Sequence, residues 1–373
     1  MTVARLLIVA ALGVLVACTP RGTIRFAEAP AEGVVVQRVF IGTTRASDNG
    51  APTVGYRSFA SRYLRHDVSL PLDRPTGALP LPPPRGEVDP RRDIVTVGER
   101  KFESDAAFRG ELAQAMRGTR RGMREAVVFV HGFNSTFAEG LYRFAQLNHD
   151  LDLPGVPVHY SWPSRAQPLG YAYDRDSALF ARDGLENLLH QVALAGADRI
   201  LLVSHSMGGH LTMEALRQLA IRGDSMVLRR IGGVILMSPD IDVDVFRAQA
   251  QAIGKLPQPF VVFTSARDRA LALSATIARE QARLGNLKDV SVLAGLDVTL
   301  LEVGAFSTGD GHFTAANSPL LISLLNGIGA IDEALGRDTS SRIGLVPSAV
   351  LTVRGATRII LSPVVAIGAG LAQ

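Results

Sequence analysis

The segment that most constrains this fold is residues 200–210, which read ILLVSHSMGGH. Four consecutive apolar residues predict a buried strand, and the small residues after them lead into LTMEAL, which is typical of a helix. A tight turn between a strand and a helix can present a serine side chain as a nucleophile. Ser206 stands at this turn, and Gly208 leaves room for the chain to turn. Ser204 occupies a position where glycine is usual, so the segment needs support from the rest of the chain.

From residue 124 onward, apolar runs of strand length alternate with segments of helical periodicity. Such alternation is typical of a mostly parallel central sheet with helices on both faces. The sequence therefore predicts an α/β fold with extra strands before it. Strands are expected at 126–130, 156–162, 199–203, 231–237, 260–263 and 298–303, with upstream strands at 34–41, 63–70 and 93–97. Helices are expected at 104–116, 136–147, 174–194, 207–221, 242–252, 269–284 and 317–328, and a proline-rich excursion at 71–90.

Composition supports a large buried core and gives little support to nucleic-acid binding. Hydrophobic residues make up 47% of the 373, which disfavours a disordered chain. The formal net charge of +4 is small for this length, and no block of Lys and Arg is flanked by aromatic residues. We therefore expect no nucleic-acid partner, and the oligomeric state is left open.

The N-terminus is expected to direct the chain to a bacterial cell envelope. Arg5 precedes an apolar run at 6–17, which is typical of a secretory signal and short for a membrane span. The sequence LVAC ends at the chain's one cysteine, Cys18, and resembles a lipobox, in which that cysteine becomes the lipidated N-terminus. An ordinary signal peptide with an incidental cysteine is the alternative. We expect a membrane-anchored lipoprotein that faces the periplasm and has no intrachain disulfide.

The C-terminal segment is apolar and interrupted by prolines. Residues 349–353 and 358–361 are candidates to pair as a hairpin, and no uninterrupted stretch is long enough for a transmembrane helix. The expected organisation is a signal peptide at 1–18, a tether at 19–33, a catalytic domain at 34–335 with a β extension at 34–123, and the apolar segment at 336–373.

A nucleophilic serine needs a base and an orienting carboxylate, and in a sheet of this type both follow the carboxyl ends of strands. Of eight histidines, His312 follows the last expected strand, in the glycine-containing loop STGDGHF. Two acids fit the order serine, acid, histidine. Asp268 follows the strand at 260–263 and is preferred, and Asp240 follows the strand before it and is the alternative.

The oxyanion of an acyl-transfer intermediate needs two hydrogen-bond donors. The backbone N–H of Met207, directly after Ser206, is the expected first donor. The turn HGFN after the first buried strand is expected to supply the second from the N–H of Phe133, because Gly132 permits a close backbone approach.

With these parts placed, residues 127–325 resemble the α/β-hydrolase superfamily. The chain is similar to a bacterial esterase/lipase-like branch of unassigned function. The resemblance implies hydrolysis of carboxylic esters or related acyl bonds through an acyl-enzyme, on a small-molecule ester or lipid substrate and without a cofactor. It is carried by FVHGFN at 129–134, YSWPS at 160–164, SHSMG at 204–208 and the loops of Asp268 and His312, and FIGTTR at 40–45 extends it toward residue 34.

Two other functions are weighed against a serine hydrolase. The unusual Ser204 leaves room for a catalytically silent protein of the same fold that acts as a binding module in the envelope. A metal hydrolase is weaker, because His205 and His210 lie five apart without a glutamate between them, and no metal site is predicted. Trp162, Phe133 and Met207 are candidates to line an apolar acyl pocket.

Overall fold

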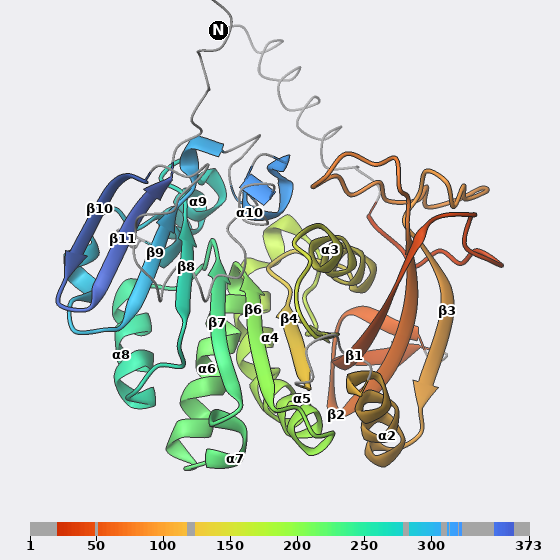
Figure 1. Cartoon of the computed structure of the whole chain (residues 1–373), viewed down its shortest axis with the longest axis horizontal. Helices are drawn as coiled ribbons and strands as arrows, with labels where there is room; N and C mark the ends of the chain where they lie inside the picture. Colours follow the sequence, from red (N-terminus) through yellow and green to blue (C-terminus); the bar gives the residue numbers. More distant parts are fainter. Residues whose placement is uncertain are drawn as a thin grey trace, which may run out of the picture.

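The computed structural model describes residues 21–48, 51–117, 124–278, 283–306, 312, 314–319, 321–322 and 347–361. The strands among these described residues form one sheet of 11, in the order β10-β11-β9-β8-β7-β6-β4-β5-β1-β2-β3 (Figure 1). The central strands are parallel, and antiparallel pairs stand at both ends of the sheet. The parallel strands are β4 (Glu125–Val130), β5 (Val156–Ser161), β6 (Arg199–His205), β7 (Ile231–Met237), β8 (Phe260–Thr264) and β9 (Val298–Glu302). The outer strands are β1 (Val35–Asp48), β2 (Ala51–Leu70), β3 (Val95–Phe102), β10 (Pro347–Val353) and β11 (Ala356–Leu361).

Helices cover both faces of the sheet, and alternate residues of a strand point to opposite faces. Val128 of β4 belongs to one buried cluster with residues of α2, α5, α6 and α8, whereas Phe129 belongs to a second cluster with residues of α3. The predicted α/β fold is therefore confirmed. The helices are α2 (Asp105–Met116), α3 (Phe137–Asp150), α4 (Tyr171–Phe180), α5 (Arg182–Leu194), α6 (Met207–Ile221), α7 (Ser225–Leu228), α8 (Val243–Ile253), α9 (Arg269–Ala278) and α10 (Thr314–Asn317), with short 3-10 turns η1 (Pro168–Gly170), η2 (Leu284–Asn286), η3 (Val290–Leu293) and η4 (Gly304–Phe306).

Three of the expected helices differ from the described structure. The helix expected over 317–328 is described as α10 at Thr314–Asn317, with further helical residues at 319 and 321–322. The helix expected over 174–194 is divided into α4 and α5 at Ala181, where ψ is −6°. The carbonyl of Ala181 accepts a hydrogen bond of 2.7 Å from the hydroxyl of Tyr160 as well as its helical bond from Leu185. Such a contact arrives from a distant strand, so helical periodicity could not reveal it. The helix expected over 269–284 is described only to Ala278, and Leu284 begins η2.

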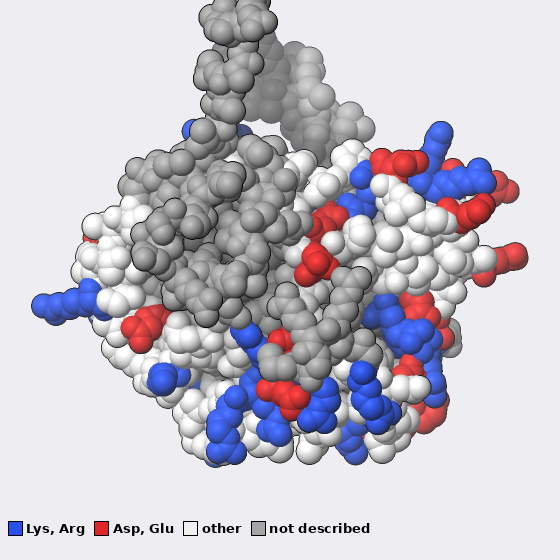
Figure 2. Space-filling model, in the orientation of Figure 1, with Lys and Arg blue, Asp and Glu red and all other residues white. Residues whose placement is uncertain are grey.

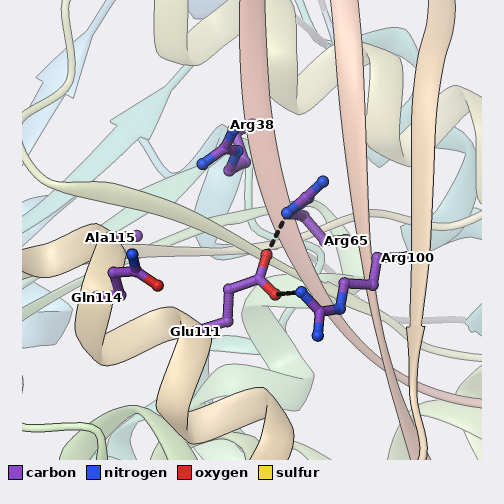
Figure 3. A pocket seen from close by; sticks show the side chains of 6 residues that line it. All are labelled: Arg38, Arg65, Arg100, Glu111, Gln114 and Ala115. Atoms are coloured by element: carbon purple, nitrogen blue, oxygen red, sulfur yellow. Dashed lines mark hydrogen bonds and ion pairs between the residues drawn. The ribbon is translucent and has the colours of Figure 1, made fainter.

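The β extension is tied to α2 by a charged cluster. Arg65 and Arg100 face each other across β2 and β3, where like charges are unfavourable. Glu111 of α2 lies between them and forms an ion pair with each, at 2.5 Å from Arg100 (Figure 3). A half-open cavity of about 400 Å³ lies beside this cluster, and its six lining residues are separate from the Ser206 region. The two ion pairs of Glu111 therefore attach α2 to β2 and β3. The lining residues are Arg38, Arg65, Arg100, Glu111, Gln114 and Ala115.

The proline-rich excursion is ordered, and so is part of the expected tether. Arg74 in the excursion forms an ion pair with Asp150 of α3, and both side chains are at most 5% exposed. Residues 21–27 run beside α3 and β3 and form hydrogen bonds to them. In one of these bonds the backbone N–H of Thr96 donates to the carbonyl of Arg25 at 2.9 Å.

Figure 2 shows acidic and basic side chains interspersed over the visible face, with basic ones more frequent along its lower edge, over α5 to α7.

The predicted C-terminal hairpin is present as β10 and β11. Its turn residues Arg354 and Gly355 have φ of 42° and 91°, the signature of a two-residue turn between antiparallel strands. β11 pairs in parallel with β9 and so extends the central sheet. None of the described helices is long and apolar enough to cross a membrane. The signal peptide at 1–18 with Cys18, the loop residues 307–311 and the segments 323–346 and 362–373 lie outside the described residues.

Candidate active site

Ser206 occupies a strained turn between β6 and α6. Its φ of 53° and ψ of −124° lie outside the regions that L-residues ordinarily adopt. The turn is held by hydrogen bonds from the Ser206 N–H to the carbonyl of Met237 (3.0 Å) and from Gly209 to the carbonyl of Ser206 (2.9 Å). A Cβ on Gly208 would lie 2.4 Å from the carbonyl oxygen of His131, so a side chain there is excluded. The predicted strand, turn and helix form with a buried Ser204 in place of the first glycine.

Asp268 and His312 are brought together from two separate loops. Nδ1 of His312 lies 2.8 Å from Oδ2 of Asp268, whose side chain is fully buried. An ionised carboxylate accepts hydrogen bonds only, so Nδ1 carries the proton and Nε2 is left to accept one. The second oxygen of Asp268 accepts from the N–H of Leu271 at 2.9 Å, which fixes the carboxylate at the start of α9.

His205 links this pair to the serine turn. Its ring packs edge-on against the ring of His312, with centroids 4.8 Å apart, and Ser206 follows it in the chain. Burial, followed by the neighbouring His312, holds the pKa of His205 well below its usual value. His205 is therefore neutral and places no positive charge beside His312. This contact between His205 and His312 could not be predicted from the sequence.

The turn after β4 lies directly against Ser206. A Cβ on Gly132 would be 3.0 Å from Cβ of Ser206 and 2.6 Å from Nδ1 of His205. Phe133 packs edge-on against Tyr171 at 5.5 Å, and Met207, at the first position of α6, is buried. Both residues predicted to supply oxyanion donors therefore belong to segments that adjoin the serine.

Arg45, on β1, holds this turn in place through hydrogen bonds, a role that the sequence did not reveal. Its side chain is fully buried, and it donates to the carbonyls of Ser135 (2.9 Å) and Ser164 (3.0 Å) and to Oγ of Ser161 (2.9 Å). Burial lowers the pKa of Arg45 to about 9, so it remains a cation at neutral pH. Nη2 lies 3.3 Å from Nε2 of His131, and burial holds the pKa of His131 well below its usual value. The cation therefore holds the loops after β4 and β5 together.

Asn134 is held by hydrogen bonds to two side chains, those of Asp174 and Arg21. Its φ is 56°, and its N–H donates to Asp174 at 3.3 Å. The guanidinium of Arg21 donates to its carbonyl (2.5 Å) and to its side-chain oxygen (2.6 Å). Asp174 also accepts from Oγ of Ser164 at 2.6 Å, and burial raises its pKa. The conformation of Asn134 is thus fixed by side chains from two other parts of the chain.

Comparison with known proteins places the chain in a family. Residues 104–326, more than half of the chain, match a family described as "Alpha/beta hydrolase of unknown function (DUF900)". The chain belongs to this family. No curated protein matches it.

Solved structures similar to this α/β hydrolase share little sequence with it. Lipase B of Aspergillus fumigatus has 14% identity and a TM-score of 0.39, over 58% of this chain and 53% of that one. An α/β-hydrolase enzyme from the metagenome of Lake Arreo has 12% identity and a TM-score of 0.37, over 88% and 95%. An esterase of Pyrobaculum calidifontis has 13% identity and a TM-score of 0.33, over 71% and 79%.

In this α/β hydrolase the alternative acid, Asp240, is engaged elsewhere. It lies 3.2 Å from Nε of Arg283, with both side chains almost fully buried, and it accepts from Oγ of Ser274 at 2.9 Å. Trp162, a candidate pocket residue, is fully buried and stacks on His131 with ring centroids 4.9 Å apart. It therefore supports the turn instead of lining a pocket. Among the described residues, no group of three or more His, Cys, Asp and Glu side chains is placed to hold a metal ion.

Proposed function

We propose that this protein is a serine hydrolase that cleaves carboxylic esters or related acyl bonds through an acyl-enzyme. The observation that carries the proposal is the 2.8 Å bond between Asp268 and His312, on loops that adjoin the strained turn of Ser206. A fully buried carboxylate on Nδ1 leaves Nε2 of the imidazole as a base, which is the arrangement that serine activation requires.

The reaction then follows from these positions. Nε2 of His312 takes the proton as Oγ of Ser206 attacks the acyl carbon, and Asp268 stabilises the imidazolium that forms. The N–H groups of Met207 and Phe133 donate to the oxyanion, and loss of one such donor typically costs about 3 kcal/mol of transition-state stabilisation. The imidazolium returns its proton to the leaving group, and water attacks the acyl-enzyme by the same route in reverse.

The enzyme is proposed to act in a bacterial envelope, anchored through a lipidated Cys18. The support is the lipobox-like LVAC after an apolar run. Metabolic labelling with a palmitate analogue tests this: we expect label on the wild type and none on Cys18→Ser. An unlabelled wild type would contradict the anchor without touching the catalytic proposal.

Labelling with a fluorophosphonate probe tests the nucleophile. We expect the purified protein to be labelled and Ser206→Ala to be unlabelled. Ser204→Ala is the matched control, because this buried serine lies two residues away in the same motif, and it should keep the label. Labelling of Ser206→Ala would refute the assignment. A folded wild type that neither reacts with the probe nor turns over esters would favour the silent binding module.

A further inference from the structure

The N-terminal segment enters the folded body beside the candidate active site. Arg21 donates to the carbonyl of Ala166 at 2.8 Å and pairs with Glu139 at 2.5 Å. The N–H of Gly22 donates to Glu139 at 2.9 Å, and Thr136 donates to the carbonyl of Gly22 at 2.8 Å. Because Arg21 also holds Asn134, the point of entry adjoins the turn that is proposed to bind the oxyanion.

Cys18 lies three residues before Arg21 in the chain. An extended chain spans at most about 3.6 Å per residue, so the Cα atoms of these two residues are within roughly 11 Å of each other by any path. A lipid attached at Cys18 would therefore hold the loop at Ala166 close to the head groups of the membrane.

Large apolar side chains are exposed on this side of the molecule. Leu169, three residues after Ala166, is 100% exposed, and Phe59 and Tyr56 on β2 are 98% and 71% exposed. Single exposed apolar residues are ordinary, but a group of them marks an interaction site. These three residues extend from two segments, the η1 loop and the start of β2.

The two segments are packed against each other. The hydroxyl of Tyr173 donates to the carbonyl of Gly55, and a Cβ on Gly55 would lie 3.2 Å from Cα of Arg165. The ring of Phe59 lies 5.1 Å from the ring of Phe180 of α4. The segments that carry Phe59 and Leu169 therefore adjoin each other, whereas alternation along β2 directs Tyr56 away from the side of its neighbour Arg57.

Two cations belong to the same adjoining segments. The guanidinium groups of Arg57 and Arg165 lie 4.4 Å and 4.2 Å from the centre of the Tyr173 ring. Aromatic rings and long basic side chains are the groups that favour a membrane–water interface. Basic residues near the surface of an anionic membrane strengthen binding to that membrane.

We propose that this face, formed by Arg57, Phe59, Arg165 and Leu169, docks on the surface of an anionic lipid bilayer, so that the candidate active site receives ester substrates from that bilayer. The substrate part rests on the proposed hydrolase function and the anchor at Cys18. The lipid anchor at Cys18 holds the protein at the bilayer without setting its orientation, and this face supplies a contact that does. Docking at the anchor's own position also raises the effective concentration of membrane-borne esters.

Contact with the bilayer is tested directly by fluorescence. The chain has one cysteine, whose thiol is consumed by lipidation, so a cysteine introduced by Leu169→Cys carries an environment-sensitive dye alone. With the lipidated full chain in vesicles of phosphatidylethanolamine and phosphatidylglycerol, we expect a blue shift at position 169. Leu194→Cys is the matched control, because Leu194 is also an exposed leucine (56%). It lies at the end of α5, just before the N-terminal end of β6, whereas Ser206 follows the C-terminal end of that strand. No shift at 169, or an equal shift at 194, overturns the proposal.

Turnover tests the substrate class. The variant Leu169→Glu with Phe59→Glu should lose roughly tenfold or more in hydrolysis of an ester embedded in these vesicles, because it removes two apolar contacts with the bilayer and places two negative charges against anionic lipid. Hydrolysis of a soluble short-chain ester should not change. Leu194→Glu with Ile221→Glu should change neither rate. Equal loss on both substrates, or none on either, refutes docking as the route of substrate entry. If the wild type cleaves no ester, the hydrolase proposal fails, whereas the fluorescence result still decides docking.

Discussion

The two sides of Ser206 are held in place by buried charges of opposite sign. On one side, the oxyanion flank (the turn at 131–135), the cation of Arg45 donates to the carbonyls of Ser135 and Ser164. On the other, the acid–base flank (Asp268 and His312), the carboxylate of Glu302 accepts from the N–H groups of Ala266 (3.2 Å) and Gly304 (3.0 Å). Buried backbone groups need hydrogen-bond partners. On the oxyanion flank the carbonyls need donors, which Arg45 supplies, and on the acid–base flank the N–H groups need an acceptor, which Glu302 supplies.

The difference matches the chemistry that is proposed for each flank. Negative charge develops at an oxyanion, and positive charge develops on the imidazole of His312. The buried cation on the oxyanion flank is opposite in sign to the negative charge that forms beside it. The buried carboxylates on the acid–base flank are likewise opposite in sign to the positive charge on His312, so each group stabilises the charge that develops near it. The supports of the loops and the electrostatics of the reaction are thus supplied by the same side chains.

The largest expected effect comes from the acid itself. Asp268→Asn should lower kcat on a short-chain ester by about 10³- to 10⁴-fold, because the amide no longer stabilises the imidazolium or selects the Nδ1–H tautomer. The free energy of unfolding should change little, since the amide oxygen can still accept from Leu271. Steady-state kinetics with denaturation in parallel checks both. An unchanged kcat would transfer the role of the acid to another carboxylate.

Asp240 should show the opposite behaviour. Asp240→Asn leaves the guanidinium of Arg283 buried without its counter-ion, and breaking such a pair costs about 3–5 kcal/mol. We expect that loss in urea unfolding, with kcat reduced far less than in Asp268→Asn. The double variant Asp240→Asn with Arg283→Gln should recover part of the stability because it removes the uncompensated charge. A large loss of kcat in a stable Asp240→Asn would overturn the choice between the two acids.

Removal of the cation tests the oxyanion flank. Arg45→Met and Arg45→Lys should both lower kcat by roughly tenfold to a hundredfold, because a misplacement of about 1 Å in a catalytic turn costs up to 10²-fold. Lysine should not rescue, since one ammonium cannot reproduce the fork that reaches separate carbonyls. Arg38→Met, at a 59% exposed side chain on the same strand, is the control and should leave kcat unchanged. Full rescue by lysine would show that charge, and not geometry, is what matters.

Removal of the carboxylate gives the matching test of the acid–base flank. Glu302→Ala leaves the N–H groups of Ala266 and Gly304 without their acceptor, and it also removes the contact with Arg358 of β11 at 3.5 Å. We expect kcat to fall by about threefold to tenfold, less than for Arg45, because the carboxylate of Asp268 keeps its own bond to Leu271. An effect as large as that of Asp268→Asn would mean that Glu302 acts in the chemistry.

Features that depend on a residue type and its position after a strand can be predicted from the sequence. Strands followed by small or polar residues predict the α/β fold, which is confirmed, and the candidates Ser206, Asp268 and His312, whose catalytic roles stay predictions. The residues that support these loops cannot be predicted in this way. Arg45 belongs to the segment FIGTTR, but only the tertiary fold brings it to Ser135, 90 residues away. Arg21 lies in a short polar segment, which carries no periodicity that would predict its docking on Asn134.

The smallest expected effect concerns Arg21, which joins the oxyanion flank to the N-terminal segment. Burial favours a raised pKa for Glu139, but hydrogen bonds from Arg21 and the Thr136 and Gly22 backbone lower it below 4.5 overall. A lowered folded-state pKa adds stability above the unfolded value, and this is lost as pH falls through the folded one. Arg21→Ala should therefore be about 1 kcal/mol less stable at neutral pH, since the pair is partly exposed, and the difference should shrink below pH 4.5. Because Asn134 also loses two donors, kcat should fall severalfold, with partial rescue by Arg21→Lys. Equal kcat in wild type and Arg21→Ala would show that Asp174 alone suffices to hold the turn.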